Sequence, residues 1–313
     1  MSRVAVIAVG GNSLIKDKQH QTVPDQFKAV CETVNHVVNM IEEGWEVVLT
    51  HGNGPQVGFI LLRSEAALDQ IHSVPVDSAV ADTQGAIGYQ FQMALDNEFA
   101  RRSLQKGSAT IVTQVVVDAN DPAFQNPTKP IGPFMDEAQA KERQEKDGWD
   151  VMEDAGRGWR RVVASPKPQR VIELEAIRAL IKAGQVVIAV GGGGVPVVER
   201  QGQLEGVAAV IDKDYASGLL AAKLGADSFI ISTAVDKVYI NYGKPEQQGL
   251  DSLTLSQAKE YLAQGHFAKG SMAPKVEAVI KFLEAGGQEA IITNPENLGQ
   301  AVKGLAGTRF IKD

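Results

Sequence analysis

Three runs of mostly apolar residues in this chain each lead directly into a glycine-rich turn. The runs cover residues 4–9, 47–50 and 185–190, and the turns are Gly10-Gly11-Asn12, His51-Gly52-Asn53-Gly54-Pro55 and Gly191-Gly192-Gly193-Gly194. Because glycine has no Cβ, the N–H groups of such a turn can converge on an anion, and a helix that follows turns its positive dipole end toward it. Ordinary strand-to-helix turn chemistry would explain any one turn alone. Three of them at the strand ends of one sheet predict a bound polyanion.

Strand and helix patterns alternate along most of the chain. Apolar residues recur at helical spacing over 26–43, for example, and Gly44 then marks the end of the helix. We predict strands over 4–9, 47–50, 110–117, 185–190, 228–233 and 289–293, and helices over 26–43, 57–67, 86–102, 171–183, 215–223, 255–264 and 274–285. Such alternation predicts a mainly parallel sheet covered by helices on both faces. A length of 313 residues allows two domains or one large α/β layer structure.

The alternation is interrupted between Asp118 and Ser165, which we interpret as an inserted subdomain. The segment contains several prolines and a charged helical stretch over 136–146. Both signs of charge are interspersed in this stretch, which favours a solvated helix face over a binding arm. The insertion joins the sheet through two crossings and has little apolar sequence with which to dock. We therefore expect a loosely attached arm that closes over the substrate and carries Lys129 to it.

Composition excludes several classes of function. The formal net charge is −7 and no Lys/Arg cluster is present, which argues against a nucleic-acid binder. The apolar run over 4–9 is too short to span a membrane, so we interpret it as a buried strand. Cys31 is the only cysteine, so it cannot form an intrachain disulfide, and we expect it to be a small core residue on a helix. These features predict a reduced, cytoplasmic protein with no membrane or nucleic-acid partner.

Neither common phosphate-binding motif is present. The nearest approach to a P-loop has Ser271 in place of the lysine, and a dinucleotide-binding pattern fails at Pro196, where the third glycine belongs. The remaining candidates are three lysines in unusual local sequence, flanked by prolines or acidic residues that restrict the backbone: Lys129, Lys213 and Lys275. We predict that these lysines hold the phosphates.

Taken together, these motifs resemble the carbamate kinases, which are members of the amino acid kinase family. The segments that carry the resemblance are 10–12, 50–58, 83–89, 126–134, 153–160, 165–168, 191–196, 211–214 and 270–275. The resemblance implies one amino acid kinase domain over 1–313, a three-layer αβα sandwich with a mainly parallel central sheet. One lobe, about 1–190, would hold carbamoyl phosphate, and the other, about 191–313, the nucleotide. The 118–165 insertion resembles the small protruding subdomain that separates carbamate kinases from other members of the family.

The resemblance also implies roles for individual residues. Lys213 and Lys275 would be the charges on the transferring phosphoryl group, Asp214 would orient them, and Lys129 would reach in from the subdomain. The implied substrate-binding residues are Gly10, Gly11, Asn12, Gly52, Asn53, Gly191, Gly192 and Gly193, and the implied nucleotide-binding residues are Thr233, Asp236, Tyr242, Met272 and Lys275. Ser13 stands where the family commonly has alanine. Mg²⁺ is expected with ATP or ADP, held by phosphate oxygens and water, and we assign no metal ligand.

The implied activity is reversible phosphoryl transfer between carbamoyl phosphate and ADP, giving ATP and carbamate. This is the reaction of a phosphotransferase with a carboxyl-group acceptor. The attacking oxygen in such a transfer is already anionic, so no base must remove a proton. Lysine charges and backbone N–H groups can then supply the catalysis, consistent with the lack of a His/Asp/Ser or paired-carboxylate pattern. We expect His51 to make a structural hydrogen bond. The usual setting of such enzymes is arginine or purine-derived catabolism.

Two alternatives stay open. One is a kinase of the same fold that acts on another small carboxylate or phosphonate. An aspartate kinase is disfavoured, because the chain ends too soon after Lys275 for a regulatory module. The other is a non-catalytic nucleotide sensor that kept the fold. The resemblance also implies a homodimer, with candidate buried faces on the helices over 30–40 and 60–68.

Overall fold

The central feature of the computed structural model is an eight-stranded sheet in the order β15-β17-β16-β12-β1-β2-β9-β3. The structure describes residues 3–11, 14–15, 17, 19–153, 158–268 and 270–313. The strands are β1 (Arg3–Val9), β2 (Trp45–His51), β3 (Ser108–Thr110), β9 (Val186–Ile188), β12 (Ser228–Ser232), β15 (Ser252–Thr254), β16 (Glu289–Thr293) and β17 (Thr308–Ile311). Neighbouring strands pair in parallel, except β16 with β17. The prediction of a mainly parallel central sheet is confirmed.

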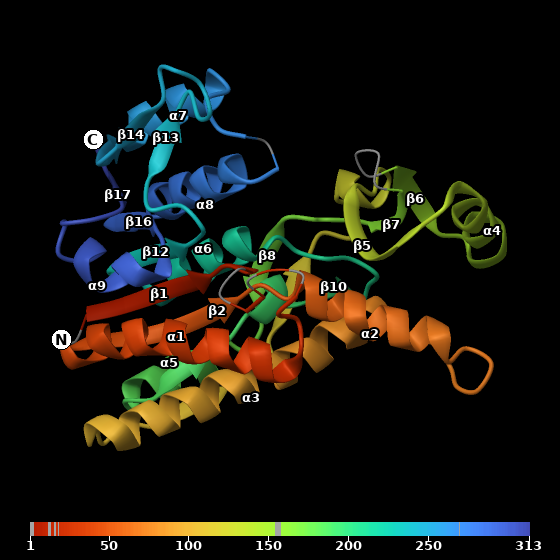
Figure 1. Ribbon diagram of the computed structural model, residues 1–313, viewed down its shortest axis with the longest axis horizontal. Coiled ribbons are helices and arrows are strands. Elements are labelled where there is room, and N and C mark those ends of the chain that lie inside the picture. The colour runs from red at the N-terminus through yellow and green to blue at the C-terminus, as the bar shows by residue number, and fades with distance from the viewer. Residues whose placement is uncertain (1–2, 12–13, 16, 18, 154–157, 269) are drawn as a thin grey trace.

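Helices cover both faces of this sheet, which makes three layers (Figure 1). The helices are α1 (Val23–Glu42), α2 (Gly54–Ala66), α3 (Val76–Arg102), α4 (Glu137–Asp147), α5 (Leu174–Lys182), α6 (Lys213–Leu224), α7 (Leu255–Ala263), α8 (Met272–Glu284) and α9 (Leu298–Ala301). Strand β1 shows how the faces divide, because successive side chains of a strand point to opposite sides. Val6 and Ala8 pack in one core cluster with α5 to α8, whereas Ala5, Ile7 and Val9 pack with α1, α3 and α9.

The register of the central strands brings the three glycine-rich turns, which follow β1, β2 and β9, to one edge of the sheet. Val9, the last residue of β1, lies between His51 of β2 and Ser232 of β12. Strand β9 continues the row, with Ile188 paired to Leu49. The chain therefore leaves β1, β2, β9 and β12 at the same carboxyl edge, where ligands bind in open α/β sheets.

The strand predicted over 110–117 is wrong, because this segment divides between two sheets. Only its first residue, Thr110, belongs to β3 of the large sheet, and residues 111–113 are in no strand. Its last four residues form β4 (Gln114–Val117) of a four-stranded sheet ordered β11-β10-β4-β8. The other strands are β8 (Pro168–Val171), β10 (Val195–Arg200) and β11 (Gln203–Gly206). The crossing is fixed at Thr113, whose N–H donates to Gln84 Oε1 at 2.7 Å and whose carbonyl accepts from Val195 N–H at 2.8 Å.

Helix boundaries differ from prediction mainly at α3, which starts at Val76 rather than near residue 86. Gly88 lies inside this helix and allows close packing, because a Cβ there would lie 2.2 Å from Thr110 Cγ2. Cys31 lies on α1 as expected but is exposed, so its predicted core position is wrong. The apolar face of α1 between Val30 and Met40 is buried within the chain, against the sheet and α3, and so cannot be the dimer face that we expected.

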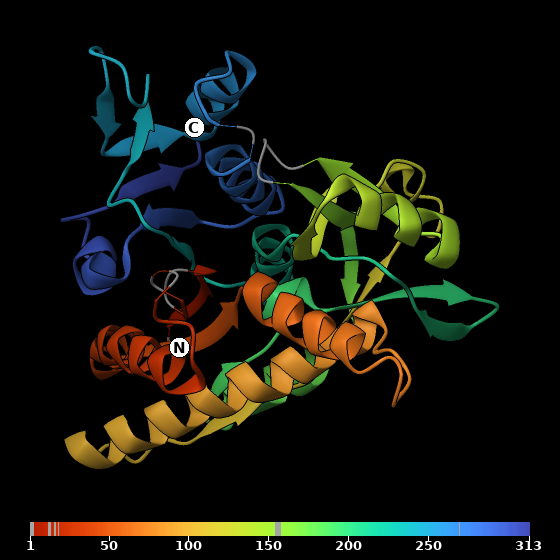
Figure 2. The same cartoon turned by 45° about the vertical axis from the view of Figure 1, so that its right-hand side comes forward.

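The 118–165 insertion projects from the end of the sandwich (Figures 1 and 2). It contains a short 3₁₀ helix η2 (Pro122–Phe124), helix α4, and a three-stranded antiparallel sheet ordered β5-β7-β6. The strands are β5 (Lys129–Met135), β6 (Asp150–Glu153) and β7 (Trp159–Val163). Asp136 and Gln139 form a capping box at the start of α4, which is the charged helix that the sequence predicted. We call this unit the arm.

The expectation that the arm has little apolar surface with which to dock is wrong. Ile131 and Val163 of the arm share a buried cluster with Val57 and Leu61 of α2 and with residues of α3. Arg143 of α4 also pairs with Glu65 of α2 at 3.3 Å. The arm is therefore held against α2 by apolar packing and by one partly buried ion pair.

A small hairpin of β13 (Val238–Ile240) and β14 (Gln248–Leu250) lies next to α7 (Figure 1).

Within the described ranges, no helix has the length and apolar character needed to cross a membrane.

Candidate active site

A cavity of about 360 Å³ opens at the carboxyl edge of the sheet. It is lined by Gly52, Asn53, Gly54, Lys129, Gly192, Val210, Ile211, Asp212, Lys213, Asp214, Gly270, Ser271, Pro274 and Lys275. Helices α2, α6 and α8 all begin among these residues. The N-terminus of a helix carries a partial positive charge and unpaired N–H groups. Three such ends at one cavity favour an anionic ligand.

At one side of this cavity, two lysines share one aspartate. Lys213 Nζ lies 2.5 Å from Asp214 Oδ1, and Lys275 Nζ lies 2.8 Å from Asp214 Oδ2. The Asp214 side chain is only 5% exposed, and those of the two lysines 14% and 15%. Lys213 is adjacent to Asp214 on α6, whereas Lys275 comes from α8. The carboxylate thus fixes two ammonium groups from different helices at one point.

Burial and charge act against each other at this cluster. Burial alone would raise the pKa of Asp214, but the ammonium groups of Lys213 and Lys275 outweigh it and lower the pKa to about 2. Burial lowers the pKa of Lys213, and the Asp214 carboxylate opposes that effect. Asp214 therefore stays ionised at neutral pH and orients both lysines through charge-assisted hydrogen bonds.

A hydrogen-bond chain positions Lys213 relative to the sheet. Ser217 Oγ, one turn along α6, donates to the Lys213 carbonyl at 2.6 Å. Thr50 Oγ1, in β2, lies 2.6 Å from the same Ser217 Oγ. Gly52 lies beside the Lys213 side chain, because a Cβ on this glycine would lie 3.4 Å from Lys213 Cδ. The first turn of α6 is thus fixed to the strand end beside it.

The third predicted lysine, Lys129, approaches from the arm. Its Nζ lies 3.6 Å from Asp212 Oδ2, and its side chain is 39% exposed. Asp212 is the N-cap of α6 and accepts a hydrogen bond from Asp214 N–H at 2.9 Å through its other oxygen. Sequence reasoning did not single out Asp212. Three ammonium groups and two carboxylates face the cavity, so its lining carries excess positive charge.

The glycines of the 191–194 turn allow close approach of other segments. Gly192 has φ +67°, and a Cβ there would lie 2.0 Å from Asn53 Nδ2. Gly193 has φ +93°, and its Cβ would lie 2.4 Å from the Ile211 carbonyl oxygen. Only glycine fits both conditions without strain. All three glycines are buried, but Gly192 lines the cavity and Gly191 and Gly193 do not.

The side chain of Gln84, to which sequence reasoning gave no role, clamps this turn. Its Nε2 donates to the Gly191 carbonyl at 2.8 Å, and its Oε1 accepts from Thr113 N–H. Gln84 therefore ties the glycine turn to the crossing between the two sheets.

The other predicted substrate-binding residues differ in whether they line the cavity. Gly52 and Asn53 line the cavity, and Asn53 Nδ2 donates to Thr83 Oγ1 at 2.8 Å. Gly10 and Gly11 are absent from the lining, although a Cβ on Gly52 would lie only 3.9 Å from Gly11 N. Asn12 lies outside the described residues, as does Ser13.

His51 is part of the structural frame of this edge. It is 1% exposed, and its Nδ1 lies 3.0 Å from the Gly52 carbonyl oxygen, to which it can only donate. Burial lowers the pKa of His51 to about 4, so the ring is neutral at physiological pH. This geometry agrees with the structural hydrogen bond that we predicted.

A second, more apolar hollow of about 230 Å³ adjoins the cavity through Ser271 and Lys275. Its lining includes four of the residues predicted to bind nucleotide: Thr233, Tyr242, Met272 and Lys275. The fifth, Asp236, does not line the hollow; it accepts a hydrogen bond from the hydroxyl of Tyr239, which does, at 2.8 Å. Tyr239, which we did not predict, therefore contributes a second ring beside Tyr242.

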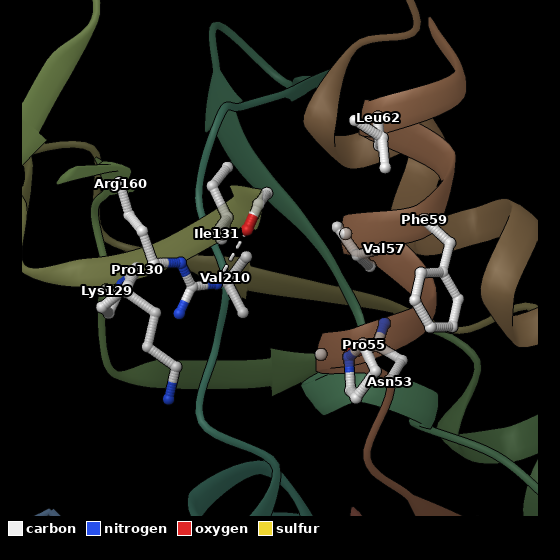
Figure 3. A pocket seen from close by; sticks show the side chains of 13 residues that line it. Asn53, Pro55, Val57, Phe59, Leu62, Lys129, Pro130, Ile131, Arg160 and Val210 are labelled. Carbon is white, nitrogen blue, oxygen red and sulfur yellow. Dashed lines mark hydrogen bonds between the residues drawn. The ribbon is translucent and has the colours of Figure 1, made fainter. Parts of the chain in front are cut away.

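A larger space of about 460 Å³ lies between α2 and the arm and shares Asn53, Gly54, Lys129 and Val210 with the cavity (Figure 3). Most of its walls are apolar, with Val57, Phe59 and Leu62 on one side. Arg160 points into it from the arm and donates through Nη2 to the Gly132 carbonyl at 3.1 Å (Figure 3). The three spaces form a row: arm side, lysine cluster, aromatic hollow.

Comparison with known proteins agrees with this arrangement. The sequence model of the amino acid kinase family matches residues 3–294. The carbamate kinase of Thermococcus kodakarensis is 49% identical over the whole of both chains, and the carbamate kinase-like protein YahI of Escherichia coli is also 49% identical over the whole of both. The solved carbamate kinase from Giardia lamblia bound to AMP-PNP has a TM-score of 0.96 and 42% identity, covering 100% of this chain and 99% of that one. The chain therefore belongs to the amino acid kinase family and, within it, to the carbamate kinases.

Proposed function

We propose that this kinase transfers a phosphoryl group reversibly between carbamoyl phosphate and ADP, giving ATP and carbamate. The observation that carries the proposal is the Lys213–Asp214–Lys275 cluster, set beside three helix N-termini in a cavity between an arm and an aromatic hollow. The similarity to the Thermococcus kodakarensis and Giardia lamblia carbamate kinases supports the choice of substrate.

In the proposed mechanism, electrostatic stabilisation replaces acid–base chemistry. Lys213 and Lys275 neutralise the charge on the transferring phosphoryl group while Asp214 holds both side chains in place, and Lys129 approaches from the arm side. The attacking oxygen of ADP or carbamate is already anionic, so no general base is required. Ammonium groups fixed before the reaction need no reorganisation when charge redistributes.

The nucleotide base would occupy the aromatic hollow, near Thr233, Tyr242 and Met272, with its phosphates toward Lys275. The residues that would bind carbamoyl phosphate are Gly10, Gly11, Asn12, Gly52, Asn53 and the 191–193 turn.

Mg²⁺ would bind together with the nucleotide, through its phosphates. Binding of the ion by phosphate oxygens fits the carboxylates of the cavity, because Asp214 is already paired with two lysines and Asp212 with Lys129. The structure's described residues contain no group of three or more His, Cys, Asp or Glu that could hold a metal. The ion would shield phosphate charge, while the lysines position the reacting group.

A coupled assay of ATP formation from ADP, Mg²⁺ and an acyl phosphate tests the function. We expect strong preference for carbamoyl phosphate over acetyl phosphate, and weak reverse activity with glutamate or aspartate as acceptors. Equal or better turnover of one of these alternatives would overturn the carbamate assignment while leaving the fold intact. Nucleotide binding without turnover of any substrate would favour the sensor alternative.

We also propose that the protein is a homodimer. Several large apolar side chains in the first 112 residues remain exposed: Val23, Leu62, Leu68, Ile71, Tyr89 and Val112. An isologous interface would cover such side chains in both copies at once. Static light scattering at micromolar concentration should give twice the chain mass of 33.5 kDa. A stable monomer under those conditions would contradict the proposal.

The setting that we propose is arginine or purine-derived catabolism, with the protein reduced and in the cytoplasm.

A further inference from the structure

The two crossings that join the arm to the sandwich are tied to each other. Asp121 lies on the outgoing crossing, where one of its oxygens caps η2 through Ala123 N–H at 2.9 Å. Its other oxygen accepts from Lys167 N–H, on the returning crossing, at 2.9 Å. Asp121 therefore joins both ends of the arm at its base.

The side chain of Lys167 then reaches the helix that carries the catalytic cluster. Its Nζ lies 3.5 Å from the ring centroid of Tyr215, which follows Asp214 directly on α6. Lys281 Nζ, from α8, lies 5.0 Å from the same centroid. A lysine ammonium at such distances is attracted to the face of an aromatic ring. Burial and the nearby Lys281 lower the pKa of Lys167, which agrees with its partial removal from water.

Tyr215 in turn bridges α6 and α8. Its hydroxyl donates a short hydrogen bond to the carboxylate of Glu277, two residues after Lys275 on α8. The two helices approach closely here, since a Cβ on Gly218 would lie 3.2 Å from the Ala278 carbonyl oxygen. Asp214 joins the helices on the cavity side, and Tyr215 joins them one residue further along.

We propose that Tyr215 and Lys167 are positioning residues for the reaction. Tyr215 fixes the spacing of α6 and α8, and hence of Lys213 and Lys275. Lys167 fixes the base of the arm, and hence Lys129, against the same helix pair. The arm and the two buried lysines thus share one point of attachment outside the cavity. This inference rests on the proposed function, because it takes the three lysines as the groups that act on the phosphoryl substrate.

Lys167→Met tests the attachment of the arm, because methionine keeps an apolar stem and loses the charge. A cation–π contact at an exposed site corresponds to about a two- to fivefold change in equilibrium. We expect kcat/KM for carbamoyl phosphate to fall by about that factor, with KM for ADP unchanged. Lys167→Arg should restore it, because a guanidinium also stacks on an aromatic ring. The matched control is Lys146→Met, which removes an exposed arm lysine paired with Glu142.

Tyr215→Phe tests the link between the helices, because it keeps the ring and removes only the hydroxyl. Loss of a hydrogen bond to a carboxylate should lower kcat by about tenfold through misplacement of Lys213 and Lys275. KM for both substrates should stay within about twofold, because each lysine can still contact bound phosphate. An unchanged kcat, or equal losses in every parameter together with a lower Tm, would overturn the positioning role.

Hydrogen exchange separates this inference from the proposed function. In the full chain without substrate, Lys167→Met should increase exchange over 118–121 and 165–168, whereas Lys146→Met should not. If the wild-type protein fails to turn over carbamoyl phosphate, the proposed function fails, yet the exchange experiment still measures the attachment of the arm. Unchanged exchange in Lys167→Met would show that Lys167 does not hold the arm, whatever the substrate.

Discussion

Replacing either buried lysine, as Lys213→Ala or Lys275→Ala, should lower kcat by about 10²–10³, the effect of losing one preorganised electrostatic contact worth about 3–4 kcal/mol. In each variant the remaining lysine still pairs with Asp214, so the carboxylate keeps a counter-charge. The fold should therefore survive both changes. Steady-state kinetics in the direction of ATP formation measure kcat, and thermal unfolding of the same samples measures Tm.

The control for this pair is Lys259→Ala. Lys259 is half exposed on α7 and pairs with Glu284, and neither residue lines the cavity, so its loss removes one positive charge outside the site. Such surface pairs contribute little to stability, about 0–1 kcal/mol. A Lys213 or Lys275 variant with near-normal kcat and a normal Tm would show that the assigned role of that lysine is wrong.

The elements that could be predicted from sequence are those fixed by local pattern. β1, β2, β12, β16 and most helices lie where apolar periodicity and glycine stops place them. The 110–117 segment could not be divided correctly, because Gln84 holds the crossing at Thr113 from a distant part of the chain. The β10–β11 hairpin did leave a signal that we did not use. Its turn has Gln201 at φ +52° and Gly202 at φ +79°, a conformation that glycine favours.

The candidate site also has parts that local sequence determines and parts that distant contacts determine. Lys213 and Asp214 are adjacent in sequence, and the unusual residues around them allowed both to be predicted. Their contact with Lys275 depends on the packing of α6 against α8. Tyr239 and Asp212 were not predicted because their roles come from the neighbours they hold, Tyr242 and Lys129.

The docking of the arm was missed for a related reason. Its apolar residues are spread among prolines and charges in sequence, but Ile131 and Val163 face α2 together once β5 and β7 pair. Closure of the arm would either break the cluster with Val57 and Leu61 or move α2, whose first turn lines the cavity. The closure itself stays a prediction.

Asp214→Asn should be the most damaging single substitution in the site. The Asp214 side chain is 5% exposed and is the shared partner of two buried ammonium groups. An amide keeps the shape but cannot balance their charge, and breaking a buried ion pair by removing one partner costs about 3–5 kcal/mol. Urea unfolding near neutral pH should show a loss of this size in the free energy of unfolding, with kcat reduced at least as much as by either lysine variant. Asp69→Asn, at an exposed aspartate, is the matched control and should change neither quantity.

The pH dependence of stability gives this prediction a second, independent measurement. The folded-state pKa of Asp214, about 2, is below its ordinary value of 3.8, so the folded protein binds fewer protons here than the unfolded chain. Its stabilisation is therefore fully present above about pH 4 and is lost as the pH falls toward 2, a total of about 2 kcal/mol. About 1 kcal/mol of this should disappear between pH 5 and pH 3 in the wild-type protein. Asp214→Asn has no carboxylate to titrate, so the difference in unfolding free energy between wild type and variant should narrow by that amount over the same interval. Parallel pH profiles for the two proteins would mean that Asp214 is not the acid-sensitive link between Lys213 and Lys275.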